Sequence, residues 1–91
     1  MYLLNAFSLQ MVQDFPCTVA FAEVSSLPEG LTSAIGHQDT ANILGVPMNR
    51  IAISLHAGDE FYIAKLQGGR LPEGSTTLPD GFYFKYLKGK I

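Results

Sequence analysis

Apolar residues gather in short runs that are separated by polar stretches containing glycine or proline. The runs Met1–Ala6 and Cys17–Val24 contain β-branched and aromatic residues and are bounded by polar segments, which predicts two strands. The runs Ile51–Leu55 and Phe61–Leu66 flank a short loop that contains glycine, a pattern typical of an antiparallel hairpin. A last run, Phe82–Tyr86, predicts a further strand near the end of the chain.

One segment carries the signals of a helix. We expect a short helix over Gln38–Leu44, with Asp39 or Thr40 able to cap its first turn. Gly45, followed closely by Pro47, ends it. The pattern therefore predicts a small α/β (α+β) fold with a β-sheet of about five strands and a short helix.

The chain has 91 residues, 47% of them hydrophobic and 15% charged, which predicts a single domain over residues 1–91. A chain this short leaves much apolar surface exposed when it is alone, so we expect a homodimer. Six basic and eight acidic residues give a formal net charge of −2, which argues against a protein that coats DNA, RNA or an anionic membrane. An anionic ligand must therefore meet a local site.

The N-terminal residues lack the basic start and long apolar stretch of a signal peptide, and no run approaches the length of a membrane span. We therefore expect a cytoplasmic protein, in the cytoplasm of the host cell if a virus encodes it. Cys17 is the single cysteine, which we expect to be a small buried apolar residue. The absence of paired cysteines and of a histidine pair at helical spacing predicts neither a metal site nor a cofactor.

His37 follows Gly36 directly at the start of the predicted helix. Free N–H groups and the helix dipole favour an anion such as phosphate at that point, and His37 is then able to protonate a leaving oxygen. The alternative is a histidine that only caps the helix or is half buried. His56, in the predicted hairpin loop, is expected to be solvated.

Several other polar residues are candidates for ligand binding, each with a plain structural alternative. Arg50 and Arg70 have the planar guanidinium that clamps a phosphate, or they are ordinary surface residues. Asn5 and Ser8 follow the first predicted strand, and their structural alternative is to bond only the backbone groups at its end. Glu73 follows a proline and is an exposed loop carboxylate on the simplest interpretation.

Four short blocks occur in order along the chain: Leu4–Met11, Ser33–His37, Asn49–Ile51 and Arg70–Gly74. Together they resemble one family, the anti-CRISPR ring nucleases of viruses and mobile elements. The resemblance implies a homodimer of mixed β-sheets flanked by helices, with a joint cleft that binds cyclic tetra-adenylate, the second messenger of type III CRISPR defence. A two-fold dimer suits a symmetric ring.

The resemblance also implies a reaction without a metal. A ribose 2′-hydroxyl attacks the adjacent phosphorus, and His37 acts as general acid on the departing 5′-oxygen. The products are linear adenylates with 2′,3′-cyclic phosphate ends. Such cleavage suppresses type III CRISPR immunity.

The resemblance carries roles over to individual positions. His37 and Glu73 are the implied catalytic residues, with Glu73 orienting the reacting groups or His37. The implied ligand-binding residues are Asn5, Ser8, Gly36, Arg50 and Arg70. Lys65 stands where some members of the family have a neutral polar residue, and we expect it to lie on a strand edge rather than to contact a phosphate.

Two other classes of function remain open. The same dimer is able to hold a cyclic nucleotide as a sponge without cutting it. A small protein-interaction factor of a phage or mobile element is the other alternative, in which the chain adds a sheet edge to a host protein and His37 serves only as a cap.

Overall fold

The computed structural model describes residues 1–5, 19–51, 53 and 55–91. Ser8, Cys17 and parts of the first two predicted strands lie outside these residues. The elements, in chain order, are β1 (Tyr2–Leu4), β2 (Ala20–Val24), β3 (Thr32–Ser33), α2 (Gln38–Leu44), β4 (Glu60–Gln67) and β5 (Tyr83–Lys90).

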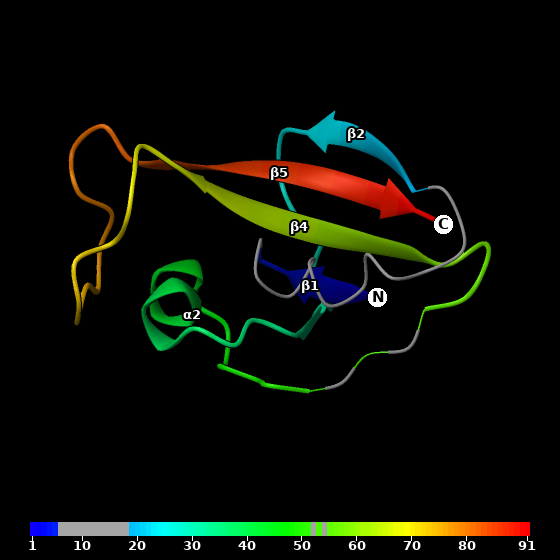
Figure 1. The fold of residues 1–91 in the computed structure, drawn as a ribbon, viewed down its shortest axis with the longest axis horizontal. Helices are drawn as coiled ribbons and strands as arrows, with labels where there is room; N and C mark the ends of the chain where they lie inside the picture. The colour runs from blue at the N-terminus through cyan, green and yellow to red at the C-terminus, as the bar shows by residue number, and fades with distance from the viewer. Residues whose placement is uncertain (6–18, 52, 54) are drawn as a thin grey trace.

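The strands form a mixed five-stranded sheet in the order β2-β5-β4-β1-β3 (Figure 1). The central strand β4 pairs antiparallel with β5 and parallel with β1, and β1 pairs parallel with β3. The predicted fold class, a small α/β (α+β) fold with a sheet of five strands, is confirmed. The membership of the sheet differs from the prediction, because β3 belongs to it and the described residues Ile51, Ile53 and Leu55 do not.

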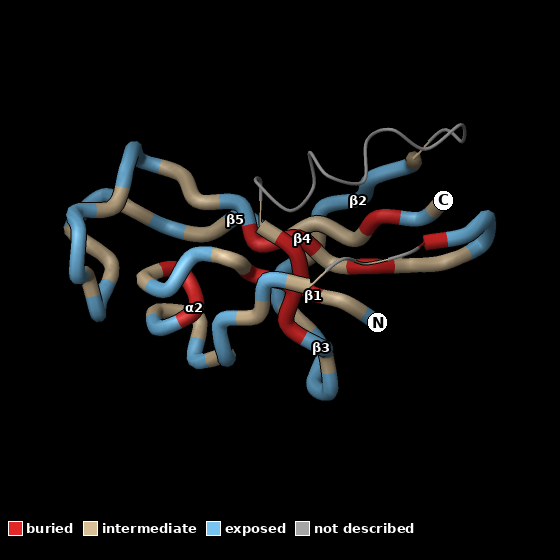
Figure 2. The backbone as a smooth tube through the Cα atoms, turned by 60° about the horizontal axis from the view of Figure 1, so that its bottom comes forward, coloured by how far each residue is buried: buried red, intermediate tan, exposed pale blue. Residues whose placement is uncertain are grey.

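Alternation along β1 and β4 places apolar side chains on both faces of the sheet. Leu3 and Ala64 pack with Ala41 of α2 on one face, whereas Leu4 and Ile63 pack on the other. Figure 2 shows that the buried residues concentrate where β1, β4 and α2 meet. We call the face that α2 covers the helix face, because the candidate site lies on it.

The segment Ile51–Leu55 was expected to be a strand paired with β4, and for its described residues this prediction is wrong. Both sides of β4 are taken, by β5 and by β1. Ile51, Ile53 and Leu55, the described residues of this segment, are outside any strand and pack on the face opposite α2. The alternating apolar pattern is therefore genuine, but it covers a sheet instead of extending one.

The helix α2 spans the predicted residues Gln38–Leu44. Gly45 ends it as expected, in the left-handed conformation with φ 72°, and its N–H bonds to the carbonyls of Ala41 and Asn42. The N-cap residue is His37, whereas Asp39 or Thr40 was expected. In the described part of the chain, no helix is long and apolar enough to cross a membrane.

Candidate functional site

A cavity of about 880 Å³ opens on the helix face, between the start of α2 and the ends of β1 and β4. Ala64 and Phe84, which belong to the apolar cluster shared with α2, form part of its wall. The described residues that line it are Asn5, Gly36, His37, Thr40, Arg50, Ala64, Lys65, Leu66, Gly69, Arg70, Leu71 and Phe84. This volume lies within the range of small-molecule sites.

Arg50 reaches the cavity because the chain that follows α2 runs back beside the segment that precedes α2. Asn49 donates its side-chain amide to the carbonyl of Ser33 at 2.9 Å and its backbone N–H to that of Ile35 at 2.9 Å. Arg50 then donates its Nε–H to the carbonyl of Gly36 at 2.9 Å. Within the described residues, the guanidinium therefore has one N–H committed to the backbone and four others that are able to bind a ligand.

Gly36 makes this approach feasible. A Cβ at this position would lie 3.1 Å from Cγ of Arg50, which is closer than such contacts normally are. The role of the glycine here is to leave room for the side chain of Arg50, since its φ is not in the left-handed region.

His37 caps α2 with its own ring. Its Nδ1 accepts a hydrogen bond from the backbone N–H of Thr40 at 3.4 Å and lies 3.4 Å from the hydroxyl of Thr40. The capping role that was the structural alternative for His37 is thus observed. Capping uses only Nδ1, so Nε2 remains available to a ligand, and the capping and catalytic interpretations are compatible.

The loop between β4 and β5, residues 68–82, brings Gly69, Arg70 and Leu71 to the cavity. Ser75 donates both its N–H and its hydroxyl to the carbonyl of Pro72, which stabilises a turn within the loop. The carboxylate of Asp39 accepts a hydrogen bond from the N–H of Gly74 at 3.0 Å. This bond joins the loop to the first turn of α2.

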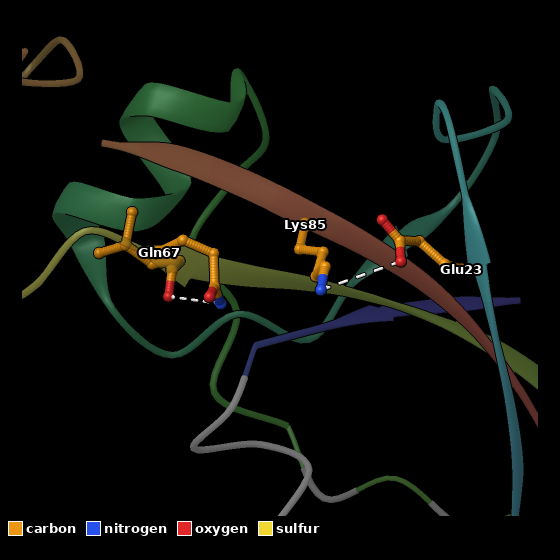
Figure 3. A network of polar contacts seen from close by, with 4 residues as sticks. Glu23, Gln67 and Lys85 are labelled. Carbon is orange, nitrogen blue, oxygen red and sulfur yellow. Dashed lines mark hydrogen bonds and ion pairs between the residues drawn. The ribbon is translucent and has the colours of Figure 1, made fainter. Parts of the chain in front are cut away.

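Lys65 was expected at a strand edge, but β4 is the central strand of the sheet, so that expectation is wrong. Lys65 is among the cavity residues, although alternation places its side chain on the same face as Ile63. Its cross-strand neighbour is Lys85, which pairs instead with Glu23 of β2 at 3.9 Å (Figure 3).

The cavity is positive within a chain that is negative overall. Arg50 and Arg70 line it, and no aspartate or glutamate is among its described lining residues. Such a site attracts anions, and guanidinium groups bind phosphate through parallel N–H donors. Among the described residues, no three His, Cys, Asp or Glu side chains are close enough to hold a metal ion.

The structure thus brings together five of the seven site residues predicted from the sequence: Asn5, Gly36, His37, Arg50 and Arg70. Ser8 lies outside the described residues. Glu73 is exposed in the loop and is not among the cavity residues, so its predicted role stays a prediction.

Sequence reasoning missed the contribution of Thr40 to the site. It was considered only as a helix cap, yet it lines the cavity and contacts the ring of His37. Its position three residues after the capping residue is where a cap bonds the backbone, and this spacing is a signal that could have identified the pair.

Comparison with known proteins places the chain among small viral proteins. A family model described as STIV B116-like matches residues 1–80, and the chain therefore belongs to that family, which is associated with a Sulfolobus virus. No curated protein matches the sequence significantly. The viral part of the sequence-based interpretation is confirmed at this level.

Proposed function

We propose that this viral family member is a ring nuclease that binds and cleaves cyclic tetra-adenylate and so suppresses type III CRISPR immunity. The observation that supports the proposal best is the cavity that holds His37 with Arg50 and Arg70 and has no carboxylate among its described lining residues. An oligoadenylate offers this site phosphates for the guanidinium groups and bases for apolar wall residues such as Leu71 and Phe84.

The reaction needs a nucleophile, a leaving group and an acid. In the proposed step, a ribose 2′-oxygen forms a bond to the adjacent phosphorus as the proton of the 2′-hydroxyl is released to solvent water, and the bond from phosphorus to the 5′-oxygen breaks. The protonated ring of His37 gives its Nε2 proton to the departing 5′-oxygen. The products are linear adenylates that carry 2′,3′-cyclic phosphate ends, and the mechanism requires no metal or other cofactor.

The arginines serve the same step by holding the phosphates so that the 2′-oxygen, the phosphorus and the 5′-oxygen lie in line. The 2′-oxygen and the phosphorus already belong to one molecule, so the arginines contribute through alignment of the reacting atoms. Loss of the acid alone costs about 10²- to 10⁴-fold. Removal of His37 is therefore expected to affect turnover far more than binding.

The proposal includes a homodimer. A ring of four nucleotides is larger than the ligands that one cavity of about 880 Å³ normally encloses. Two cavities related by a two-fold axis would each receive half of a symmetric ring. Two active sites per dimer follow, one from each protomer.

The first test is incubation of the purified protein with cyclic tetra-adenylate and a metal chelator, followed by separation of the products. The His37→Ala variant is the matched comparison, and the His56→Ala variant controls for loss of the other histidine. Linear adenylates from wild type and His56→Ala, but not from His37→Ala, are the expected result.

Two other results would overturn the proposal in different ways. An intact ring that is retained by all the proteins identifies a sponge. An intact ring that none of them binds excludes a role in cyclic adenylate signalling and favours a protein-interaction factor.

A further inference from the structure

Thr40 is a buried residue with a hydroxyl whose presence packing does not explain. The residue is 9% exposed, and an apolar residue of the same shape would fill this position without a polar atom to satisfy. Within the described residues, the polar contact of the hydroxyl is Nδ1 of His37 at 3.4 Å. The same Nδ1 also lies 3.4 Å from the backbone nitrogen of Thr40.

The backbone N–H and the hydroxyl of Thr40 differ in the hydrogen bonds that each is able to make with Nδ1 of His37. The backbone N–H of Thr40 is only a donor, so it pairs with His37 when Nδ1 carries a lone pair and the neutral ring has its proton on Nε2. The hydroxyl of Thr40 is both a donor and an acceptor, so it is able to pair with Nδ1 in either state.

This difference matters for the proposed reaction. The neutral ring that the helix cap favours is not an effective acid, because loss of its Nε2 proton would leave an anionic ring. The acid is the protonated ring, which has a hydrogen on Nδ1 as well. That hydrogen faces the N–H of Thr40, which is only a donor, so the protonated ring needs a separate acceptor at Nδ1.

We propose that Thr40 is a positioning residue for His37: its backbone N–H holds the neutral ring, and its hydroxyl accepts the Nδ1–H of the protonated ring. This inference rests on the proposed function for its catalytic meaning. After the Nε2 proton moves to the 5′-oxygen, the ring is neutral with its remaining proton on Nδ1, still bonded to the hydroxyl. Reprotonation at Nε2 restores the acid.

Other charged groups near the ring are the same in wild type and in the variants below. Arg50, Lys65 and Arg70 line the same cavity, and Asp39 lies on α2 with its carboxylate bonded to the N–H of Gly74. A change at Thr40 that alters the behaviour of His37 therefore reports on the hydroxyl and not on these charges.

The test compares Thr40→Val and Thr40→Ala, which remove the hydroxyl, with Thr40→Ser, which keeps it. The first measurement is an NMR titration of the two histidine rings in the full chain without ligand, with melting curves to confirm folding. We expect the titration curve of His37 to move to lower pH in both hydroxyl-free variants and to stay in place in Thr40→Ser. His56 should not move in any of them.

The second measurement is the cleavage of cyclic tetra-adenylate across pH. We expect kcat to fall about tenfold in Thr40→Val with little change in KM, since part of the contribution of the general acid is lost. The basic limb of the pH profile should move to lower pH, and Thr40→Ser should restore both.

The outcomes separate this inference from the proposed function. An unchanged titration curve of His37 in both hydroxyl-free variants would overturn the inference, whatever the activity. A moved titration curve in proteins that never cleave the ring would support the pairing of Thr40 with His37 and overturn the ring nuclease.

Discussion

The carboxylate of Asp39 accepts a hydrogen bond of 3.0 Å from the backbone N–H of Gly74, 35 residues further along the chain. Asp39 belongs to the first turn of α2, directly beside the residues of the cavity. Gly74 lies in the loop that carries Arg70 and Glu73. A single bond thus links the element that positions the proposed acid to the loop that carries Arg70, the proposed phosphate-binding residue.

The first prediction concerns this link. Asp39→Ala should leave the sheet intact and release the loop, because an exposed hydrogen bond of this kind contributes only about 1 kcal/mol to folding. Hydrogen exchange at the N–H of Gly74 should accelerate, and the affinity for cyclic tetra-adenylate should fall severalfold. Asp59→Ala is a matched control, since Asp59 makes a comparable bond to the N–H of His56 in a different loop. Equal effects of both substitutions on affinity would contradict the prediction.

The second prediction concerns Gly36 and Arg50. Gly36→Ala places a methyl group 3.1 Å from Cγ of Arg50, so the arginine must shift and its bond to the carbonyl of residue 36 weakens. Affinity for cyclic tetra-adenylate, measured by calorimetry, should fall about tenfold, close to the effect of Arg50→Ala. The double variant should be no weaker than Arg50→Ala alone, because both changes remove the same contact. Additive losses would show that residue 36 acts independently of Arg50.

The helix and the site residues beside it could be predicted from the sequence because their signals are local. Gln38–Leu44 is bounded by a capping residue and by Gly45, and both act within one turn of the helix. Gly36 and His37 are adjacent in sequence, so a short motif places them together. The convergence of Arg50 and Arg70 on the same cavity needed the resemblance to a family, since no local pattern links them.

The sheet order could not be predicted, for a physical reason that Ile51–Leu55 illustrates. Alternation of apolar residues reports that one side of a segment is buried, and not which backbone groups it bonds to. Thr32–Ser33, a two-residue strand, carries too short a pattern to be recognised. Its membership in the sheet depends on parallel pairing with β1, a nonlocal contact.

The third prediction concerns pH and the pair Glu60–Lys88. The hydrogen bond and the charge of Lys88, 2.8 Å away, hold the pKa of Glu60 below its ordinary value of 4.5. The same bond and the charge of Glu60 raise the pKa of Lys88 above its ordinary value of 10.5. The contribution of Glu60 is therefore present above its unfolded pKa and is lost as pH falls through its lower folded pKa. The contribution of Lys88 is present below its unfolded pKa and is lost as pH rises through its higher folded pKa.

Melting temperatures across pH test this pair. Glu60→Gln should melt slightly below wild type at neutral pH and low salt, and the difference should vanish in strong acid, where the wild-type carboxylate is protonated. High salt should also reduce it, because both side chains are partly exposed. Glu29→Gln, in an exposed turn, is the control and should not change the melting temperature. A difference for Glu60→Gln that persists unchanged in acid would rule out the ion pair as its origin.

The fourth prediction concerns Gly89, which lies in β5 directly between two aromatic residues. Its register partners are Phe21 in β2 and Phe61 in β4, whose rings meet edge to face with centroids 6.2 Å apart. A Cβ on residue 89 would lie 2.7 Å from Cε2 of the fully buried Phe61 ring. Gly89→Ala should therefore destabilise the fold by about 1–3 kcal/mol in a denaturant titration, since overpacking forces the ring out of its position.

The origin of this loss of stability is tested by replacing Phe61 with a smaller side chain. Phe61→Leu alone removes buried volume and should also destabilise the protein. In the double variant Gly89→Ala with Phe61→Leu, the smaller side chain leaves room for the new methyl group, so the total loss should be clearly less than the sum of the two single losses. Strict additivity would mean that the methyl group does not meet Phe61. The cost at residue 89 would then have to arise from the backbone of β5 instead of the packing between its two neighbouring strands.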